Sequence, residues 1–176
     1  MPLETDDVKQ NHVPGIVLDA IDRKILAALV QDAKQTNAAI GQIAGLSAPA
    51  VHERIKRLCR QGVISGTVAL LNGAAVGKPL LSFVHVDADG WGKSQRMMRL
   101  ADFPEVEEIH SVAGDTSLIL KVRTASPDAL EHFLSQLYVL PGVRATKSFV
   151  VLSTYEERVT QAEVTSDWPA IPMPPE

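Results

Sequence analysis

The sequence lacks most features that mark secreted, membrane-spanning or metal-binding proteins. Its 176 residues include a single cysteine, Cys59, so no disulfide can form within one chain. No run approaches the ~18 apolar residues of a membrane-spanning helix, and the N-terminus lacks the basic and then apolar order of a secretion signal. The five histidines show no close metal-ligand spacing. We therefore expect a cytoplasmic protein with no metal, no cofactor and no membrane partner.

Two short helical patterns joined at a glycine occupy residues 36–61. Gly45 supplies the conformational freedom that the corner of a helix-turn-helix requires. Ser47 is expected to cap the second helix, because its side-chain oxygen can accept from the first free backbone N–H groups. Pro49 fits the first turn, where its missing N–H costs nothing. The pattern is typical of a helix-turn-helix that binds double-stranded DNA.

The second of these helices has an apolar stripe on one side and cations on the other. Helical spacing predicts that the stripe consists of Val51, Ile55 and Leu58. At 100° per residue the opposite face presents Pro49, Glu53, Lys56, Arg57 and Arg60, with His52 at the flank and Arg54 leaning toward the packed side. Residues 47–62 carry four Lys or Arg against one acid, although the chain has a net charge of −4. A basic face on an acidic protein indicates a local site for a polyanion.

A further helix over residues 19–32 completes a three-helix unit. Its buried stripe is expected to consist of Leu18, Ile21, Ile25, Leu26 and Leu29, with Asp19 or the preceding turn as the cap. A single helix-turn-helix in one groove binds weakly, so such domains usually pair to place two recognition helices about one duplex turn apart. The remaining chain is therefore expected to contain a dimerisation module.

The second half of the chain alternates between strand and helix periods. Strands are expected at 80–87, 106–113, 117–124 and 145–153, and helices at 93–101 and from Ser126 onward. The order βαββαβ predicts a ferredoxin-like antiparallel sheet with both helices on one face. The other face, with Ile119, Phe149 and Val151, would be free to stack on a second copy.

These elements give an α+β chain with five parts. Residues 1–17 are expected to form a flexible arm, and residues 18–66 a helix-turn-helix domain of winged-helix-like type. Residues 67–79 follow as a linker. It contains the end of a strand expected at 63–71 and then a turn. Residues 80–157 form the ferredoxin-like domain, and the Pro-rich residues 158–176 form a tail.

The chain resembles the leucine-responsive regulator/AsnC (Lrp/AsnC) family of bacterial and archaeal transcription regulators over residues 18–157. The motifs that carry the resemblance are LDAIDRKIL at 18–26, GLSAPAVHERIKRLCRQGVISG at 45–66, ALLN at 69–72, HSVAGDTSLILKV at 110–122, LPGV at 140–143 and SFVVL at 148–152. The resemblance implies a sequence-specific transcription regulator, whose dimers assemble into tetramers or octamers. It also implies a small effector, expected to be an amino acid, bound between dimers.

Two sets of site residues follow from these patterns. On the recognition helix we expect Lys56, Arg57 and Arg60 to neutralise phosphate, and Ser47, Pro49, His52 and Glu53 to contact base edges. The family resemblance places effector contacts at Gly114, Asp115 and Thr116, and in the strand segment Phe149, Val150 and Val151. The Asp115 carboxylate can accept from an α-ammonium group. The chain departs from the family after this aspartate, where an aromatic residue is common.

Two alternatives belong to other functional classes. The siroheme decarboxylases have a similar two-domain layout. Their strand before the central hairpin carries a motif that resembles His-Asn-Tyr-Arg-Arg, whereas this chain has His110-Ser111-Val112-Ala113-Gly114 there. The cations are absent, so no catalytic residue is expected. An amino-acid sensor without a DNA-binding role would make the helix-turn-helix superfluous. Reversing the charge of Lys56 and Arg57 is expected to remove DNA binding and leave the oligomer intact.

Overall fold

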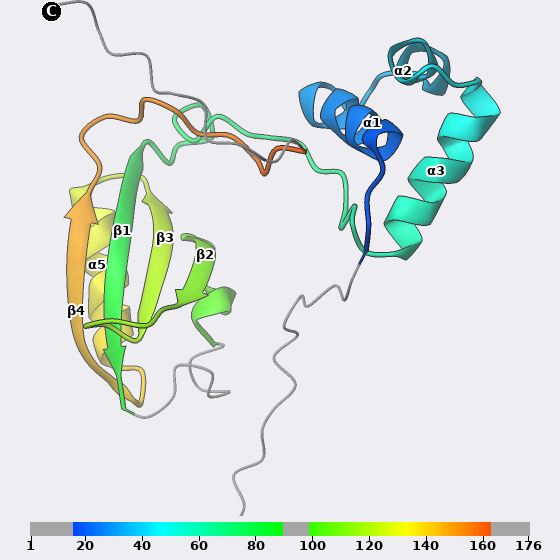
Figure 1. Ribbon diagram of the computed structural model, residues 1–176. Coiled ribbons are helices and arrows are strands. Elements are labelled where there is room, and N and C mark those ends of the chain that lie inside the picture. The colour runs from blue at the N-terminus through cyan, green and yellow to red at the C-terminus, as the bar shows by residue number, and fades with distance from the viewer. Residues whose placement is uncertain (1–15, 90–98, 163–176) are drawn as a thin grey trace, which may run out of the picture. The chain divides into compact units, whose positions relative to one another are not determined.

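The computed structural model describes residues 16–89 and 99–162, which divide into two compact units (Figure 1). The helical unit contains α1 (Ala20–Gln31), α2 (Asn37–Ala44) and α3 (Ala48–Arg60). The sheet unit contains β1 (Leu80–Ala88), η1 (Arg99–Asp102), β2 (Val106–Ser111), β3 (Leu118–Thr124), α5 (Pro127–Tyr138) and β4 (Val143–Val150). None of the described helices is long and apolar enough to cross a membrane.

Helix α1 begins with a reciprocal cap between two aspartates. Asp19 Oδ1 accepts from the Asp22 backbone N–H at 2.6 Å, and Asp22 Oδ2 accepts from the Asp19 N–H at 3.3 Å. Arg54 of α3 also donates from Nη1 to Asp19 Oδ2 at 2.7 Å. The bond from Arg54, followed by the Asp22 N–H bond, holds the pKa of Asp19 below its ordinary value of 3.8. The sequence prediction of Asp19 as a cap is confirmed.

The turn between α2 and α3 depends on two glycines. Gly45 ends α2 with φ 72°, a left-handed conformation that glycine adopts without a steric penalty. Gly41 lies inside α2, where an added Cβ would meet the Leu46 carbonyl oxygen at 2.4 Å. The absence of a side chain at Gly41 therefore lets the turn fold closely onto the helix. Sequence analysis identified Gly45 but not Gly41.

Helix α3 packs as its spacing predicts but begins differently. Val51 and Leu58 are fully buried, and Ile55 packs against the same core. Ser47 stands at the N-cap position, yet its side chain makes no capping hydrogen bond, so that prediction was wrong. Its hydroxyl remains exposed at the start of the helix. Cys59, expected at the edge of the stripe, is exposed, because the residue after Leu58 is turned 100° away.

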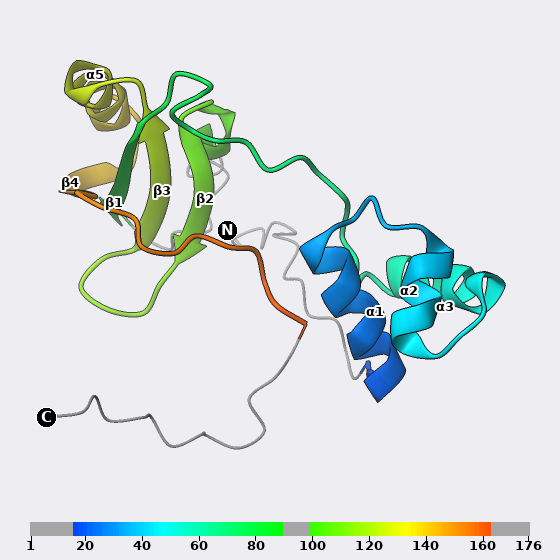
Figure 2. The same cartoon turned by 90° about the horizontal axis from the view of Figure 1, so that it is seen from above.

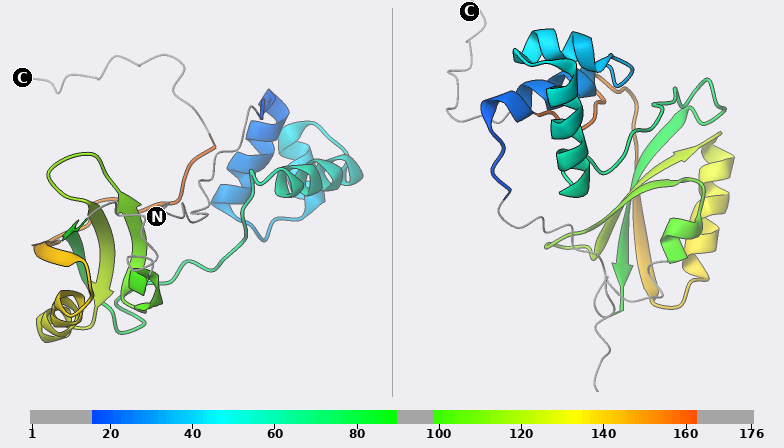
Figure 3. Two further views of the ribbon diagram at one scale, coloured as in Figure 1. Left: turned by 90° about the horizontal axis from the view of Figure 1, so that it is seen from below. Right: turned by 90° about the vertical axis from the view of Figure 1, so that its right-hand side faces the viewer.

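The sheet unit has the predicted ferredoxin-like arrangement. Its strands lie in the order β2-β3-β1-β4, and every neighbouring pair is antiparallel. Helix α5 and η1 lie on one face, and the opposite face is uncovered within the sheet unit (Figures 2 and 3). The core between sheet and helices consists of Val84, Val86, Leu100, Leu118, Leu120, Val122, Leu130, Phe133 and Leu137, with Ala88 at its margin. Strand alternation therefore leaves one set of side chains on the uncovered face.

Several predicted boundaries differ from the structure. The strand expected at 63–71 does not form: residues 65–72 have no regular structure, because no strand among the described residues pairs with them. Nor does any strand accompany the three helices as a wing among residues 16–68. Most of the helix expected at 93–101 lies outside the described residues, which resume with η1 and its buried Leu100. The arm at 1–15 and residues 163–176 also lie outside them.

The start of the expected C-terminal tail contacts the helical unit. The chain after Tyr155 clusters with the helices rather than with the sheet. Arg23 of α1 donates from Nη1 to the carbonyl oxygen of Ala162 at 2.9 Å. The chain therefore returns to α1 after the sheet unit ends.

The replacement Asp19→Asn tests the charge at the cap of α1. Asparagine can still accept from the Asp22 N–H but carries no charge toward Arg54. A pKa lowered by folding contributes stability above about pH 4, which is lost as the pH falls through the folded pKa. We expect the variant to be less stable at pH 7 and the difference to shrink below pH 4. Urea unfolding followed by circular dichroism from pH 7 to pH 3 measures this, and a difference that stays constant with pH contradicts it.

Candidate nucleic-acid interface and effector region

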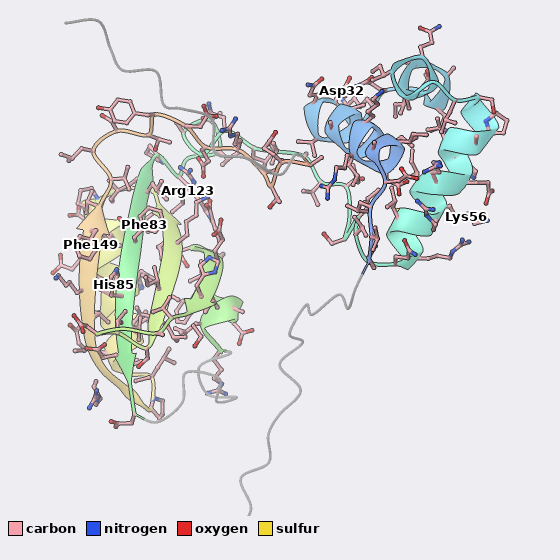
Figure 4. The ribbon with its side chains drawn as sticks, viewed as in Figure 1. Asp32, Lys56, Phe83, His85, Arg123 and Phe149 are labelled. Atoms are coloured by element: carbon pink, nitrogen blue, oxygen red, sulfur yellow. The ribbon has the colours of Figure 1, made fainter. Side chains whose placement is uncertain are left out.

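The exposed side of α3 carries most of the residues expected to contact DNA. Lys56 (Figure 4) is exposed on the C-terminal half of the helix, and Arg60, four residues on, is exposed as well. Toward its N-terminus the exposed residues are Ser47, Pro49, His52 and Glu53. Cations at one end and short polar groups at the other can contact phosphate and base edges, respectively.

Arg57 does not follow this arrangement. Its Nη2 donates to Asp22 Oδ1 at 2.5 Å, and its side chain is 40% exposed. Asp22 itself is 1% exposed, at the third position of α1. The prediction that Arg57 points outward was wrong, because the helical wheel of α3 does not include the buried carboxylate on the neighbouring helix.

Arg54 completes the same ionic cluster. It leans toward the packed side as predicted, and its Nη1 donates to Asp22 Oδ1 at 2.8 Å as well as to Asp19 Oδ2. The bonds to Asp19 and then Asp22 raise the pKa of Arg54 above its ordinary value. The exposed side of α3 therefore offers two cations, Lys56 and Arg60, where the sequence suggested three.

Asp22 is the functional residue that sequence analysis missed. The spacing of Asp19 and Asp22 is that of a capping box and could have identified both residues as caps. A buried carboxylate requires cationic or hydrogen-bonding partners, and Arg54 and Arg57 lie three residues apart on the helix packed against it. The capping-box spacing together with the two arginines is the signal that was available.

The predicted effector loop joins β2 to β3. Gly114 and Asp115 are exposed there, and a Cβ at Gly114 would meet no atom of the described chain within 4 Å. Thr116 is turned inward: its hydroxyl donates to the Val86 carbonyl at 3.1 Å. Ser117 Oγ accepts from the Ala88 N–H at 3.2 Å. The end of the loop is thus attached to β1, and Asp115 faces solvent.

The second predicted effector segment lies elsewhere on the sheet. Phe149 of β4 is on the uncovered face, where its ring lies 4.9 Å from the ring of His85 and 5.1 Å from Lys147 Nζ (Figure 4). Val150 is exposed and Val151 is half-buried.

The sheet register separates these two predicted effector segments. Phe149 pairs with Phe83, whereas Leu118, which follows the loop, pairs with Val86. The two segments are therefore two strands apart and offset by about 10 Å along the strands. One chain does not bring the two predicted effector segments together.

His110, the residue considered for acid or base chemistry, belongs to a surface ion-pair cluster. Its Nε2 lies 2.9 Å from Glu108 Oε2, and the side chain is 58% exposed. The bond from His110 is the main cause that lowers the pKa of Glu108. Lys121 pairs with the same glutamate at 3.4 Å, and Arg123 pairs with Glu107 at 2.9 Å. The cluster joins β2 to β3 by ion pairs, in which Lys121 and Arg123 are only 16% and 15% exposed, and this pairing indicates a structural role for His110 and Glu108.

Family models match both parts of the chain. An AsnC-type helix-turn-helix domain matches residues 18–58, and an Lrp/AsnC ligand binding domain matches residues 83–160. The transcriptional regulator FL11 of Pyrococcus horikoshii is 34% identical over 142 residues, which cover 81% of this chain and 94% of FL11. The leucine-responsive regulatory protein of Escherichia coli K12 is 35% identical over 148 residues, which cover 82% and 90%. The first is named as a transcriptional regulator and the second as a regulatory protein, and neither is named as an enzyme.

Solved structures agree with the fold. The crystal structure of LrpA from Mycobacterium tuberculosis is 35% identical with a TM-score of 0.72, covering 83% of this chain and 100% of that one. The regulator NMB0573 of Neisseria meningitidis, solved as a complex with L-Met, has a TM-score of 0.75 at 24% identity, covering 85% and 98%. Because sequence matches cover both units and the architecture is shared, the chain belongs to the Lrp/AsnC family of transcriptional regulators.

Proposed function

We propose that this regulator binds DNA as a homodimer through the exposed side of α3 and responds to an amino acid. The observation that carries the proposal is the position of Lys56 and Arg60, exposed on the face opposite buried Val51 and Leu58. On the major groove these two cations contact phosphate. Ser47, Pro49, His52 and Glu53 contact base edges, and the hydroxyl of Ser47 is available because it does not cap the helix.

The uncovered face of the sheet is the proposed dimer surface. Its centre contains Phe83 and Phe149, which pair in register and are 39% and 45% exposed in the single chain. Ile119 lies on the same face, opposite His85 in the sheet register. Aromatic side chains grouped on one strand pair favour burial against a second copy, which presents the same groups. Dimers assemble further into tetramers or octamers.

The effector site is proposed at Asp115 and at the strand segment of Phe149, Val150 and Val151. These residues are separated within one chain, so a site that contains both is assembled from more than one copy. An amino-acid ligand is supported by the family's ligand binding domain and by the name of the leucine-responsive relative. Asp115 would accept from the ligand's α-ammonium group. Binding between dimers would change their arrangement, and so which spacings of DNA half-sites are engaged together.

Charge reversal at Lys56 and Arg60 tests the DNA-binding face. We expect the double variant Lys56→Glu, Arg60→Glu to weaken binding on the order of 100-fold or more, because two phosphate contacts become repulsive. Arg57 is left unchanged, since its reversal would also place a second carboxylate beside Asp22. The matched control reverses Lys24 and Arg158, two exposed cations outside α3. Fluorescence anisotropy on DNA from upstream of the gene measures affinity; equal losses in both double variants would contradict the proposal.

The replacement Phe83→Glu tests the dimer surface. A carboxylate at the centre of the interface would be removed from water on dimerisation, even with Lys121 opposite it in the sheet register, and should raise the dimer dissociation constant by about 30-fold or more. The control Val139→Glu adds the same charge at an exposed apolar residue after α5. Analytical ultracentrifugation over a concentration series measures the constant. A dimer that survives Phe83→Glu unchanged would show that the interface lies elsewhere.

The replacement Asp115→Asn tests the effector site. Loss of a charge-assisted hydrogen bond should weaken the response to the active amino acid by about tenfold, with DNA affinity unchanged in its absence. Anisotropy titrations against a panel of twenty amino acids first identify the active one in the unmodified protein. Asp128→Asn, at an exposed residue in the first turn of α5 and beyond the other end of β3, serves as the control. The same response in both variants would exclude Asp115 from the site.

A further inference from the structure

Two arginines of α3 meet at one buried carboxylate of α1. Asp22 of α1 is 1% exposed, and its Oδ1 accepts from Arg54 Nη1 at 2.8 Å and from Arg57 Nη2 at 2.5 Å. Because Arg54 also reaches Asp19 Oδ2 at 2.7 Å, the contact spans the first turn of α1. Both arginines belong to α3, the helix that faces DNA.

We propose that Arg57, together with Arg54, positions the recognition helix through Asp22 and does not bind phosphate. This inference rests on the proposed DNA-binding face of α3 and divides its cations into two roles. Lys56 and Arg60 contact the nucleic acid. Arg54 and Arg57 are positioning residues that determine where the outer side chains lie in the groove.

The geometry of the cluster constrains α3 in two directions. The apolar contacts of Val51, Ile55 and Leu58 are not directional, so they hold α3 against its neighbours without strongly fixing its rotation. Hydrogen bonds weaken steeply when their angle or length changes. Since Arg54 and Arg57 are three residues apart and share one acceptor oxygen, rotation or sliding of α3 would lengthen at least one bond.

The burial of Asp22 gives Arg57 a stronger partner than phosphate at the surface. A carboxylate removed from water requires compensation, and two guanidinium groups supply it. Moving Arg57 to a phosphate would leave Asp22 with fewer partners in a low-dielectric site. Arg57 Nε is also buried and has no hydrogen-bond partner among the described residues, so this part of the side chain lies within the protein.

A positioning role and a phosphate contact give different salt dependences. Each phosphate contact contributes about 0.9 to the slope of log affinity against log salt concentration. Loss of such a contact weakens binding to every DNA sequence equally. A displaced recognition helix instead loses base contacts, so it binds its own site less well and random DNA as before.

The test compares Arg57→Gln with Lys56→Gln in the full chain. Affinity is measured for a duplex selected from a random library by the unmodified protein and for random-sequence DNA, each over a salt series. For Arg57→Gln we expect an unchanged slope and a ratio of specific to random affinity reduced by roughly tenfold or more, as for a lost base contact. For Lys56→Gln we expect a slope smaller by about 0.9 and an unchanged ratio.

A double variant separates action through Asp22 from other effects. Asp22→Asn combined with Arg57→Gln removes the buried charge and its partner together, and keeps an acceptor for Arg54. Asp22→Asn is also measured alone, and we expect the double variant to lose no more of the specificity ratio than Arg57→Gln does, because both replacements break the same contact. Circular dichroism and thermal unfolding establish that each variant is folded at the temperature of the binding assay. If Arg57→Gln does not fold, the double variant is compared directly with Asp22→Asn, and equal slopes and ratios in these two are then expected.

Each other outcome overturns the inference. A slope that falls by about 0.9 in Arg57→Gln, with the ratio unchanged, makes Arg57 a phosphate contact. A lower melting temperature with unchanged slope and ratio makes its role purely structural. Losses of the ratio that multiply in the double variant, as for two independent residues, exclude action through Asp22. An unchanged slope in Lys56→Gln contradicts the proposed DNA-binding face instead, so the two proposals fail separately.

Discussion

A buried carboxylate requires cationic partners, and those of Asp22 lie on α3, the helix that we propose binds DNA. That requirement joins the stability of the helical unit to its function. Both guanidinium groups compensate the buried charge, and that of Arg54 also bonds Asp19 at the cap of α1. In our proposal, these ion pairs determine the position of the side of α3 that binds DNA and are not themselves contacted by DNA. An acidic chain can in this way present a basic surface with few exposed cations.

The sheet unit has a comparable division between its two faces. Alternation along β1 and β3 places Val84, Val86 and Leu120 against α5, and leaves Phe83, His85 and Ile119 on the uncovered face. One face of the sheet packs against the helices of the same chain, and the other is proposed to pack against a second copy in the dimer. Because the alternation has a period of two, a one-residue change of register would exchange these roles. Folding of the sheet and exposure of the proposed dimer surface are consequences of one pattern.

Sequence analysis predicted correctly the features that depend on local spacing along the chain. It was wrong about features that depend on contacts between residues far apart in the sequence. Apolar spacing and caps located α1, α3 and α5 to within about two residues, and the order βαββαβ predicted the sheet. The prediction of a strand at 63–71 was wrong because a strand needs a neighbouring strand to pair with, and no strand among the described residues lies beside this segment. Arg57 was misplaced because a helical wheel contains no information about Asp22 on another helix. For the effector residues, the register places Asp115 and Phe149 apart, and spacing along the chain could not indicate that distance.

The loop between β2 and β3 is anchored at its end and open at its tip. Thr116 and Ser117 attach it to β1 through the Val86 carbonyl and the Ala88 N–H, while Gly114 and Asp115 extend from the fold into solvent. Substitutions at the tip can therefore accumulate during evolution without disturbing the hydrogen bonds that close the sheet. Duplicated copies of such a gene could diverge in the signal they recognise while keeping the same folded framework and the same way of reading DNA.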